Sequence, residues 1–304
     1  MDRFVDLTGI RQQGFTSVHV IPNGRIANGT AALVSTAGLP PRESIVAAPT
    51  LANFALMPPR GNDYPQTLMG AHAHLRQAFL DAQRFAVHRK LYAAASRQVP
   101  RPPADDVLTA LEQVLGGRRR AAFRVHTRDD IHRAIAFCRE HKIHPVLLGV
   151  DSAAECLEQL QQGSYDLLLS MKFGRQPQIQ RPPSNKNLTA SLPEPLKVQR
   201  DRTRQWTRRV QGIGQLHRRG IKLAVGSRGL KDRGELLKEI RQAIEHGWPV
   251  SAALESLTTE PARILGLPKR LGTLDPVHRQ RRDLPRPRGR TRARRRRHAR
   301  VGVG

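Results

Sequence analysis

The chain has 304 residues, with 52 Lys and Arg against 25 Asp and Glu, which gives a formal net charge of +27. Residues 277–304 hold twelve Arg and one acid, Asp283, so the remaining 276 residues carry 40 − 24 = +16. Two cysteines exclude a disulfide scaffold and a Cys-rich zinc module. No apolar run approaches the roughly 18 residues of a membrane span. No signal peptide is visible in residues 1–14, so by default we expect a cytoplasmic protein.

Short apolar runs alternate with amphipathic helical patterns along the chain. The expected strands are residues 16–21, 121–125, 145–149, 166–170 and 221–225. The expected helices are a long one at 68–99, one after each of the strands at 121–125 and 145–149, a basic one at 203–219, one from about 232, and two short ones at 251–257 and from about 259. Residues 173–202 contain five prolines and no periodicity, so no element is expected there.

Two helix starts have a sequence signature. Thr127 followed by Asp130 is a capping-box pattern, and Ser152 followed by Glu155 is a second one. Cys138 lies on the apolar face of the first of these helices and is expected to be a small buried hydrophobe.

Strands that alternate with helices predict βαβ units around a parallel sheet. The last four expected strands are almost wholly apolar, as expected of strands covered on both faces. A doubly wound sheet and a (β/α) barrel both satisfy this pattern. No Gly-rich dinucleotide or phosphate-binding motif follows any of the strands, which weakens a nucleotide-binding interpretation.

Several histidines are candidate metal ligands or bases. His72 and His74 have a ligand-like spacing, but they lie in a helical pattern, where two such side chains diverge by roughly 200°. We therefore do not assign a site to them. His126 follows the strand at 121–125, where it is either a metal ligand or base, or a structural strand-end residue. His141 and His144 are expected to face solvent.

Two further positions have open or negative assignments. Arg228 follows the last strand within a Ser-Arg-Gly turn, where it either binds an anionic substrate or points into solvent. Cys156 has no histidine at a suggestive spacing, and no nucleophile is proposed.

Several segments resemble the metal-dependent amidohydrolase superfamily, specifically its imidazolonepropionase-like branch. They are GFTSV at 14–18, NGTAALV at 28–34, TLMGAHAHLRQAFLDAQ at 67–83, and the segments at 123–155, 221–247 and 251–276, of which the last (SAALESLTTEPARILGLPKRLGTLDP) is the most specific. The resemblance implies an α/β fold, a (β/α)8 TIM-type barrel over residues 1–276 that is incomplete (its first strand missing) and has a long helical insertion. Residues 277–304 are expected to be a disordered, Arg-rich tail.

The resemblance also implies a ligand set for one or two divalent metals, most simply zinc, that activate water for attack on an amide-type carbonyl. Of this set, His126 matches the fifth-strand ligand. The sixth-strand position falls at Gly149, the position of the family aspartate falls at Arg228, and the first-strand His pair has no counterpart here. The expected ligand set is therefore incomplete.

Three functions follow as hypotheses. The first is a metal-dependent hydrolase of carbon–nitrogen bonds in a small-molecule amide. The second is a non-catalytic or truncated relative. The third is non-specific nucleic-acid binding through the basic tail, whose Arg residues attract phosphate. The tail also fits a frameshift that replaces closing strands, because Arg, Pro and Gly are frequent in out-of-frame readings of GC-rich DNA. No membrane association is expected.

Overall fold

The computed structural model describes residues 7–59, 61–150, 152–163, 165–179 and 194–274. The strands are β1 (Ser17–Val20), β2 (Ala27–Thr30), β3 (Ala32–Ser35), β4 (Ile45–Ala47), β5 (Ala52–Ala55), β6 (Ala121–Arg124), β7 (Val146–Gly149), β8 (Asp166–Ser170) and β9 (Leu223–Gly226). The helices are α1 (Thr8–Gln12), α2 (Pro41–Ser44), α3 (Leu68–Ala94), α4 (Asp106–Leu115), α5 (Arg128–Glu140), α6 (Leu157–Gly163), α7 (Leu196–Arg218), α8 (Leu236–Glu245), α9 (Val250–Leu257) and α10 (Thr259–Ile264), with short 3-10 turns η1 (Ala153–Glu155) and η2 (Arg233–Glu235). The Arg-rich segment 277–304, expected as a tail, lies outside the described residues.

The main sheet has the strand order β2-β5-β6-β7-β8-β9, and β5 to β9 are all parallel to their neighbours. The strand β2 pairs antiparallel with β5, and a second, antiparallel sheet has the order β1-β3-β4. These βαβ units confirm the predicted α/β class and are consistent with a TIM-type barrel. Within the described residues the six strands pair in a linear order, with β2 and β9 at the edges.

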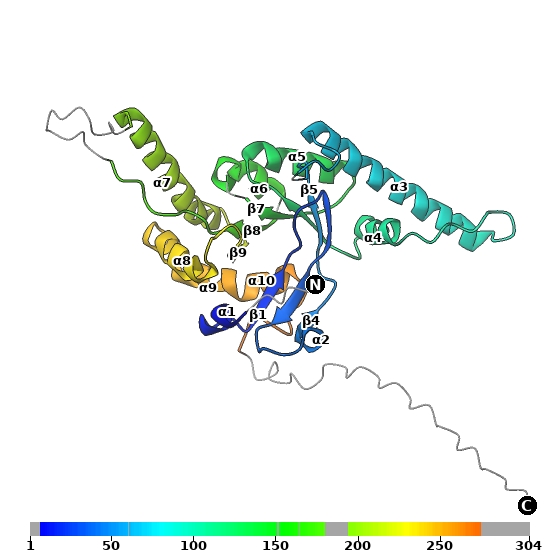
Figure 1. Ribbon diagram of the computed structural model, residues 1–304, viewed down its shortest axis with the longest axis horizontal. Helices are drawn as coiled ribbons and strands as arrows, with labels where there is room; N and C mark the ends of the chain where they lie inside the picture. The colour runs from blue at the N-terminus through cyan, green and yellow to red at the C-terminus, as the bar shows by residue number, and fades with distance from the viewer. Residues whose placement is uncertain (1–6, 60, 151, 164, 180–193, 275–304) are drawn as a thin grey trace, which may run out of the picture.

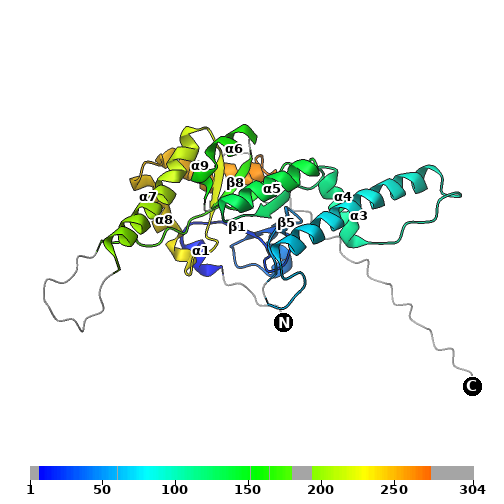
Figure 2. The same cartoon turned by 90° about the horizontal axis from the view of Figure 1, so that it is seen from above.

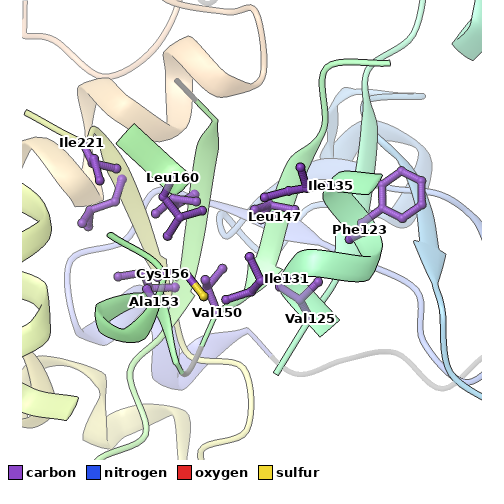
Figure 3. Close-up of a cluster of buried hydrophobic side chains, with 14 of the residues drawn as sticks. Phe123, Val125, Ile131, Ile135, Leu147, Val150, Ala153, Cys156, Leu160 and Ile221 are labelled. Atoms are coloured by element: carbon purple, nitrogen blue, oxygen red, sulfur yellow. The ribbon is translucent and has the colours of Figure 1, made fainter. Parts of the chain in front are cut away.

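One face of the main sheet is covered by helices, and side chains alternate between the two faces as the pleat requires. Figure 3 shows Ile135 of α5 beside Leu147 of β7, and Ile131 of α5 near Val125 and Val150. Leu160 of α6 extends the same core toward β9. The opposite face carries a smaller cluster, in which Ile264 of α10 packs with residues of β6, β7 and β9. Because these strands are covered on both faces, their sequences are apolar.

Two helices extend from the ends of the sheet. Figures 1 and 2 show α3 and α7 projecting from opposite sides of the body. The helix α3 confirms the predicted long helix, and it buries a single stripe that includes Leu75, Phe79 and Phe85. The prediction for α7 was wrong at its start: the helix begins at Leu196, directly after Pro195, and not at residue 203.

The two predicted helix caps have different outcomes. The Thr127 hydroxyl accepts from the Asp130 amide at 3.2 Å, and Asp130 Oδ2 accepts from the Thr127 amide at 3.0 Å, so the predicted capping box is confirmed. The prediction of a cap at Ser152 was wrong. The Ser152 side chain makes no capping hydrogen bond, and a 3-10 turn precedes α6.

Charged side chains at the amino end of the parallel strands tie α10 to the sheet. Asp166, the first residue of β8, accepts hydrogen bonds from Arg120 and, at 2.5 Å, from Arg263 of α10. Arg120 also donates to the carbonyl of Ile264 at 2.8 Å, and Arg263 donates to Glu260 at 2.8 Å. Burial raises the pKa of Asp166, but the hydrogen bonds from Arg263 and Arg120 outweigh it and hold the pKa below its usual value. The network therefore fixes the closing helix against the start of the sheet.

Candidate active site at the carboxyl edge of the sheet

The carboxyl ends of β6 to β9 meet at one edge of the sheet, because these four strands are parallel and adjacent. In parallel α/β folds this edge carries the functional residues. The sequence places His126 after β6, Lys172 after β8 and Arg228 after β9 at this edge. The structure therefore places His126 and Arg228, both singled out in the sequence, at the same edge.

His126 lies against Gly149, the last residue of β7. The His126 amide donates to Asp130 Oδ2 at 3.1 Å, which holds the residue at the start of α5. A Cβ atom added to Gly149 would lie 3.6 Å from both Cε1 and Nδ1 of the His126 ring. The two positions that the resemblance assigns to neighbouring metal ligands are thus neighbours in space.

Gly149 cannot carry a side chain in this conformation. Its φ is +98°, in the region that side-chain-bearing residues rarely adopt, and an added Cβ would lie 2.7 Å from the carbonyl oxygen of Val125. The glycine lets β6 and β7 approach closely at their carboxyl ends. The position is therefore shaped for glycine and excludes the histidine that the family pattern expects.

Arg228 lies half-buried in a turn closed by the hydrogen bond from the Leu230 amide to the Ser227 carbonyl, at 3.2 Å. An added Cβ at the next residue, Gly229, would lie 3.3 Å from Cδ of Lys172. The side chain of Lys172, which follows β8, therefore packs against the turn that carries Arg228.

Two carboxylates at this edge are engaged by the backbone. Asp130 accepts from the amides of His126 and Thr127, and Glu239 of α8 accepts from the Phe173 amide at 3.0 Å. Burial raises the pKa of Asp130. Hydrogen bonds from the Thr127 amide, the Arg133 guanidinium and the His126 amide lower it by more, so the pKa lies below its usual value. Both groups fix the loops in place.

The described residues do not fit the family's metal centre. They contain no cluster of three His, Cys, Asp or Glu side chains able to hold an ion. His126 offers one imidazole, whereas zinc requires three or four protein ligands. The position of Gly149 has no room for a metal-binding side chain, and Arg228 brings a positive charge to the position of the family aspartate. No catalytic step through a metal is therefore derived for these residues.

The structure confirms that His72 and His74 are helical residues of α3. Their rings make edge contacts with different partners, Phe137 at 5.7 Å and Tyr64 at 6.4 Å. Burial is the main cause that lowers the pKa of His72.

His141 was predicted to face solvent, and this was wrong: the residue is 5% exposed. Its ring packs on Phe137 at 4.6 Å and on Phe79 at 5.1 Å, so aromatic residues of α5 and α3 cover it. His144 is exposed, as predicted.

Both cysteines are buried, as expected for Cys138 from its place on the helix. Burial raises the pKa of the Cys138 thiol and, as the largest cause, that of Cys156. Neither thiol is therefore prepared for nucleophilic attack at neutral pH.

Sequence reasoning missed Arg124 and His19. Arg124 ends β6 and its guanidinium donates to Asn23 and, at 3.5 Å, to the Pro22 carbonyl, which links the sheet to the loop after β1. His19 of β1 contacts the Thr50 hydroxyl at 2.8 Å, and burial lowers its pKa to about 4. Successive side chains of a strand point to opposite faces of the sheet. This alternation could have indicated that Arg124 lies on the face opposite to that of Phe123.

Comparisons with known proteins find a family model and solved structures that resemble parts of this chain. The model of the amidohydrolase family matches residues 201–276, which run from α7 to just beyond α10. An amidohydrolase from Thermotoga maritima MSB8 superimposes with a TM-score of 0.69 at 20% identity, over 87% of this chain and 64% of that one. A Xaa-Pro dipeptidase superimposes with a TM-score of only 0.41 at 14% identity, over 75% of this chain and 46% of that one. No protein of curated function matches the sequence.

The family model matches residues 201–276, and the Thermotoga protein shares the fold, so the chain is similar to the amidohydrolases in that segment and in its architecture. The chain spans 64% of the length of the Thermotoga protein. None of the helices in the part of the chain that the structure describes is both long and apolar enough to cross a membrane.

Proposed function

We propose that the protein is a hydrolase that acts on the carbon–nitrogen bond of a small-molecule amide, in the manner of the imidazolonepropionase-like branch. The observation that carries the proposal is the family match over residues 201–276, because that segment contains the last parallel strand and the Arg228 turn at the carboxyl edge. The substrate would lie at this edge, where His126 and Arg228 end their strands.

The residues at this edge have chemistry that suits such a substrate. The imidazole of His126 has two ring nitrogens that can donate or accept a hydrogen bond. A guanidinium such as that of Arg228 stabilises negative charge that develops on an oxygen. Divalent metal, most simply zinc, is the cofactor that the superfamily implies. Because His126 alone matches its ligand set among the described residues, no role for the metal is assigned to them.

The test measures turnover and metal content together. The purified full chain is assayed with cyclic amides and N-acyl amino acids, with and without added zinc, and its bound metals are determined by mass spectrometry. We expect turnover that His126→Ala abolishes, whereas His132→Ala, an exposed histidine on α5, leaves it unchanged. A protein without metal and without turnover in either condition would reject the proposal.

A second candidate is a relative that binds small molecules without hydrolysing them. Gly149 and Arg228 favour this candidate. Gly149 leaves no room for a metal-binding side chain, and Arg228 carries charge of the wrong sign for metal binding. The two candidates differ in one result: a non-catalytic protein binds amides whose structure remains intact after long incubation.

A further inference from the structure

A large cavity separates the edge strands of the two sheets. Its volume is about 770 Å3, and residues of both β1 and β9 line it. Both are edge strands of their sheets, and no described strand lies between them. Leucines of α8 and α9 and residues of α10 close the cavity. We call this space the β1–β9 cavity.

The size and lining of the β1–β9 cavity are those of a ligand site. Ligand pockets commonly have volumes of roughly 300–1,000 Å3 and are mostly apolar with a few placed polar groups. The apolar wall here includes Leu148, Leu168, Leu236 and Leu257. A space lined in this way favours an apolar guest, because water finds few hydrogen-bonding partners there.

The charged side chains on the wall are all positive. Arg228 and Arg233 line the cavity, and none of the described lining residues is Asp or Glu. His19 also lines it, but it is neutral at pH 7 because burial lowers its pKa to about 4. The two guanidiniums therefore supply the charge on this wall, and a guanidinium matches the planar geometry of a carboxylate with paired hydrogen bonds.

We propose that the β1–β9 cavity binds a carboxylate with an apolar body, such as a medium-chain fatty acid, with its carboxylate on Arg228 and Arg233 and its chain along the leucines. The proposal does not depend on hydrolysis. His126, whose loss tests the hydrolase, is not among the residues that line the cavity. Binding and turnover can therefore fail separately.

The test is isothermal titration of the full chain with decanoate and with the uncharged analogue decanol. Decanoate is expected to bind at least tenfold more tightly than decanol, because a hydrogen bond to a charged group contributes enough to change affinity by about tenfold or more. Arg228→Gln and Arg233→Gln should each weaken decanoate binding about tenfold and leave decanol binding unchanged.

Two control variants separate the cavity from general attraction to a basic protein. Arg241→Gln removes the same charge from an exposed site on α8 outside the cavity and should leave decanoate binding unchanged. Leu254→Trp enlarges a residue that is 62% exposed at the cavity and should weaken both ligands without unfolding the protein, as checked by circular dichroism. Equal loss with Arg241→Gln, or equal affinity for decanoate and decanol, would overturn the proposal.

Discussion

The two ends of the parallel strands differ in how their charges are used. At the amino end, Asp166 is held between Arg120 and Arg263, and opposite charges neutralise one another. At the carboxyl end, Lys172 packs against the turn that carries Arg228, Glu239 accepts from a backbone amide, and Asp130 accepts from two amides and from Arg133. The amino end therefore holds an ion network that stabilises the fold, whereas the carboxyl end places Arg228 on the wall of a large cavity.

This division matches the general arrangement of barrel enzymes, in which one end of the sheet serves stability and the other serves function. In this chain the stabilising end has a complete ion network. The carboxyl end has the capping box at α5, while its side chains depart from the ligand set that the resemblance implies. Four substitutions test this contrast, in order of decreasing expected effect.

Gly149→His at the carboxyl end should destabilise the protein by about 3 kcal/mol, because the positive φ and the crowding against Val125 act together. Urea unfolding followed by circular dichroism measures the change. The matched control is Gly117→His, since Gly117 also has a positive φ (+69°) but has open space around its Cβ position, so only about 1 kcal/mol is expected. A stable Gly149→His variant that binds zinc would contradict this account of the edge.

Asp166→Asn at the amino end should cost about 2 kcal/mol. Removing one partner of a buried ion pair typically costs about 3–5 kcal/mol, and the value is reduced here because the side chains of Arg120 and Arg263 are 34% and 38% exposed. Asp63→Asn, which removes an exposed pair at 3.8 Å, should change the unfolding free energy by less than about 0.5 kcal/mol.

The same substitution changes the acid stability. Because the pKa of Asp166 is lower in the folded state, its contribution is present above about pH 4 and is lost as pH falls through the folded-state value. Unfolding free energies measured from pH 6 down to pH 2 should therefore converge for the wild type and Asp166→Asn. A constant difference across this range would show that the ion network is not the cause.

Asp130→Ala should cost about 1 kcal/mol, because it removes the acceptor for the His126 and Thr127 amides at the start of α5. Its neighbour Asp129 is exposed and makes no part of the capping box, so Asp129→Ala is the matched control with a smaller effect. Thermal melts of the two variants compare them directly. Equal losses would show that helix-end charge, and not the capping box, matters here.

His141→Gln should produce the smallest change, in the pH dependence of stability. Burial lowers the pKa of His141, so the unfolded chain binds more protons and stability decreases as pH falls below about 6.5. Replacement by glutamine should flatten this slope between pH 7 and pH 5, whereas His144→Gln should leave it unchanged because His144 is exposed. An identical slope in the two variants would argue against a buried neutral imidazole.

Much of the parallel sheet could be predicted from the sequence. The strand β8 has the predicted bounds, and β6, β7 and β9 differ from theirs by one or two residues. These strands are buried on both faces, so their residue types record the fold directly. The strands β2 to β5 were not predicted as elements, because segments such as Ala27–Thr30 are short, partly exposed and weakly apolar.

For the candidate site, the sequence could predict only which residues follow which strands. The sequence placed His126 and Arg228 after their strands, since position after a strand is local information. It did not reveal the positive φ of Gly149, which depends on the close approach of Val125. The contacts of His141 and the β1–β9 cavity join segments far apart in the chain, so no local pattern carries them.

Among the described strands β9 lies at an edge of the main sheet, and this position bears on how copies of the protein interact. An edge strand presents backbone groups that can pair with another chain, and the few residues of β9, Leu223–Gly226, offer only a short template. The net charge of +27 adds repulsion between copies. Salt reduces the range of that repulsion from about 10 Å at 0.1 M to about 3 Å at 1 M. Colloidal stability should therefore be greatest in dilute buffer and decrease as salt is added.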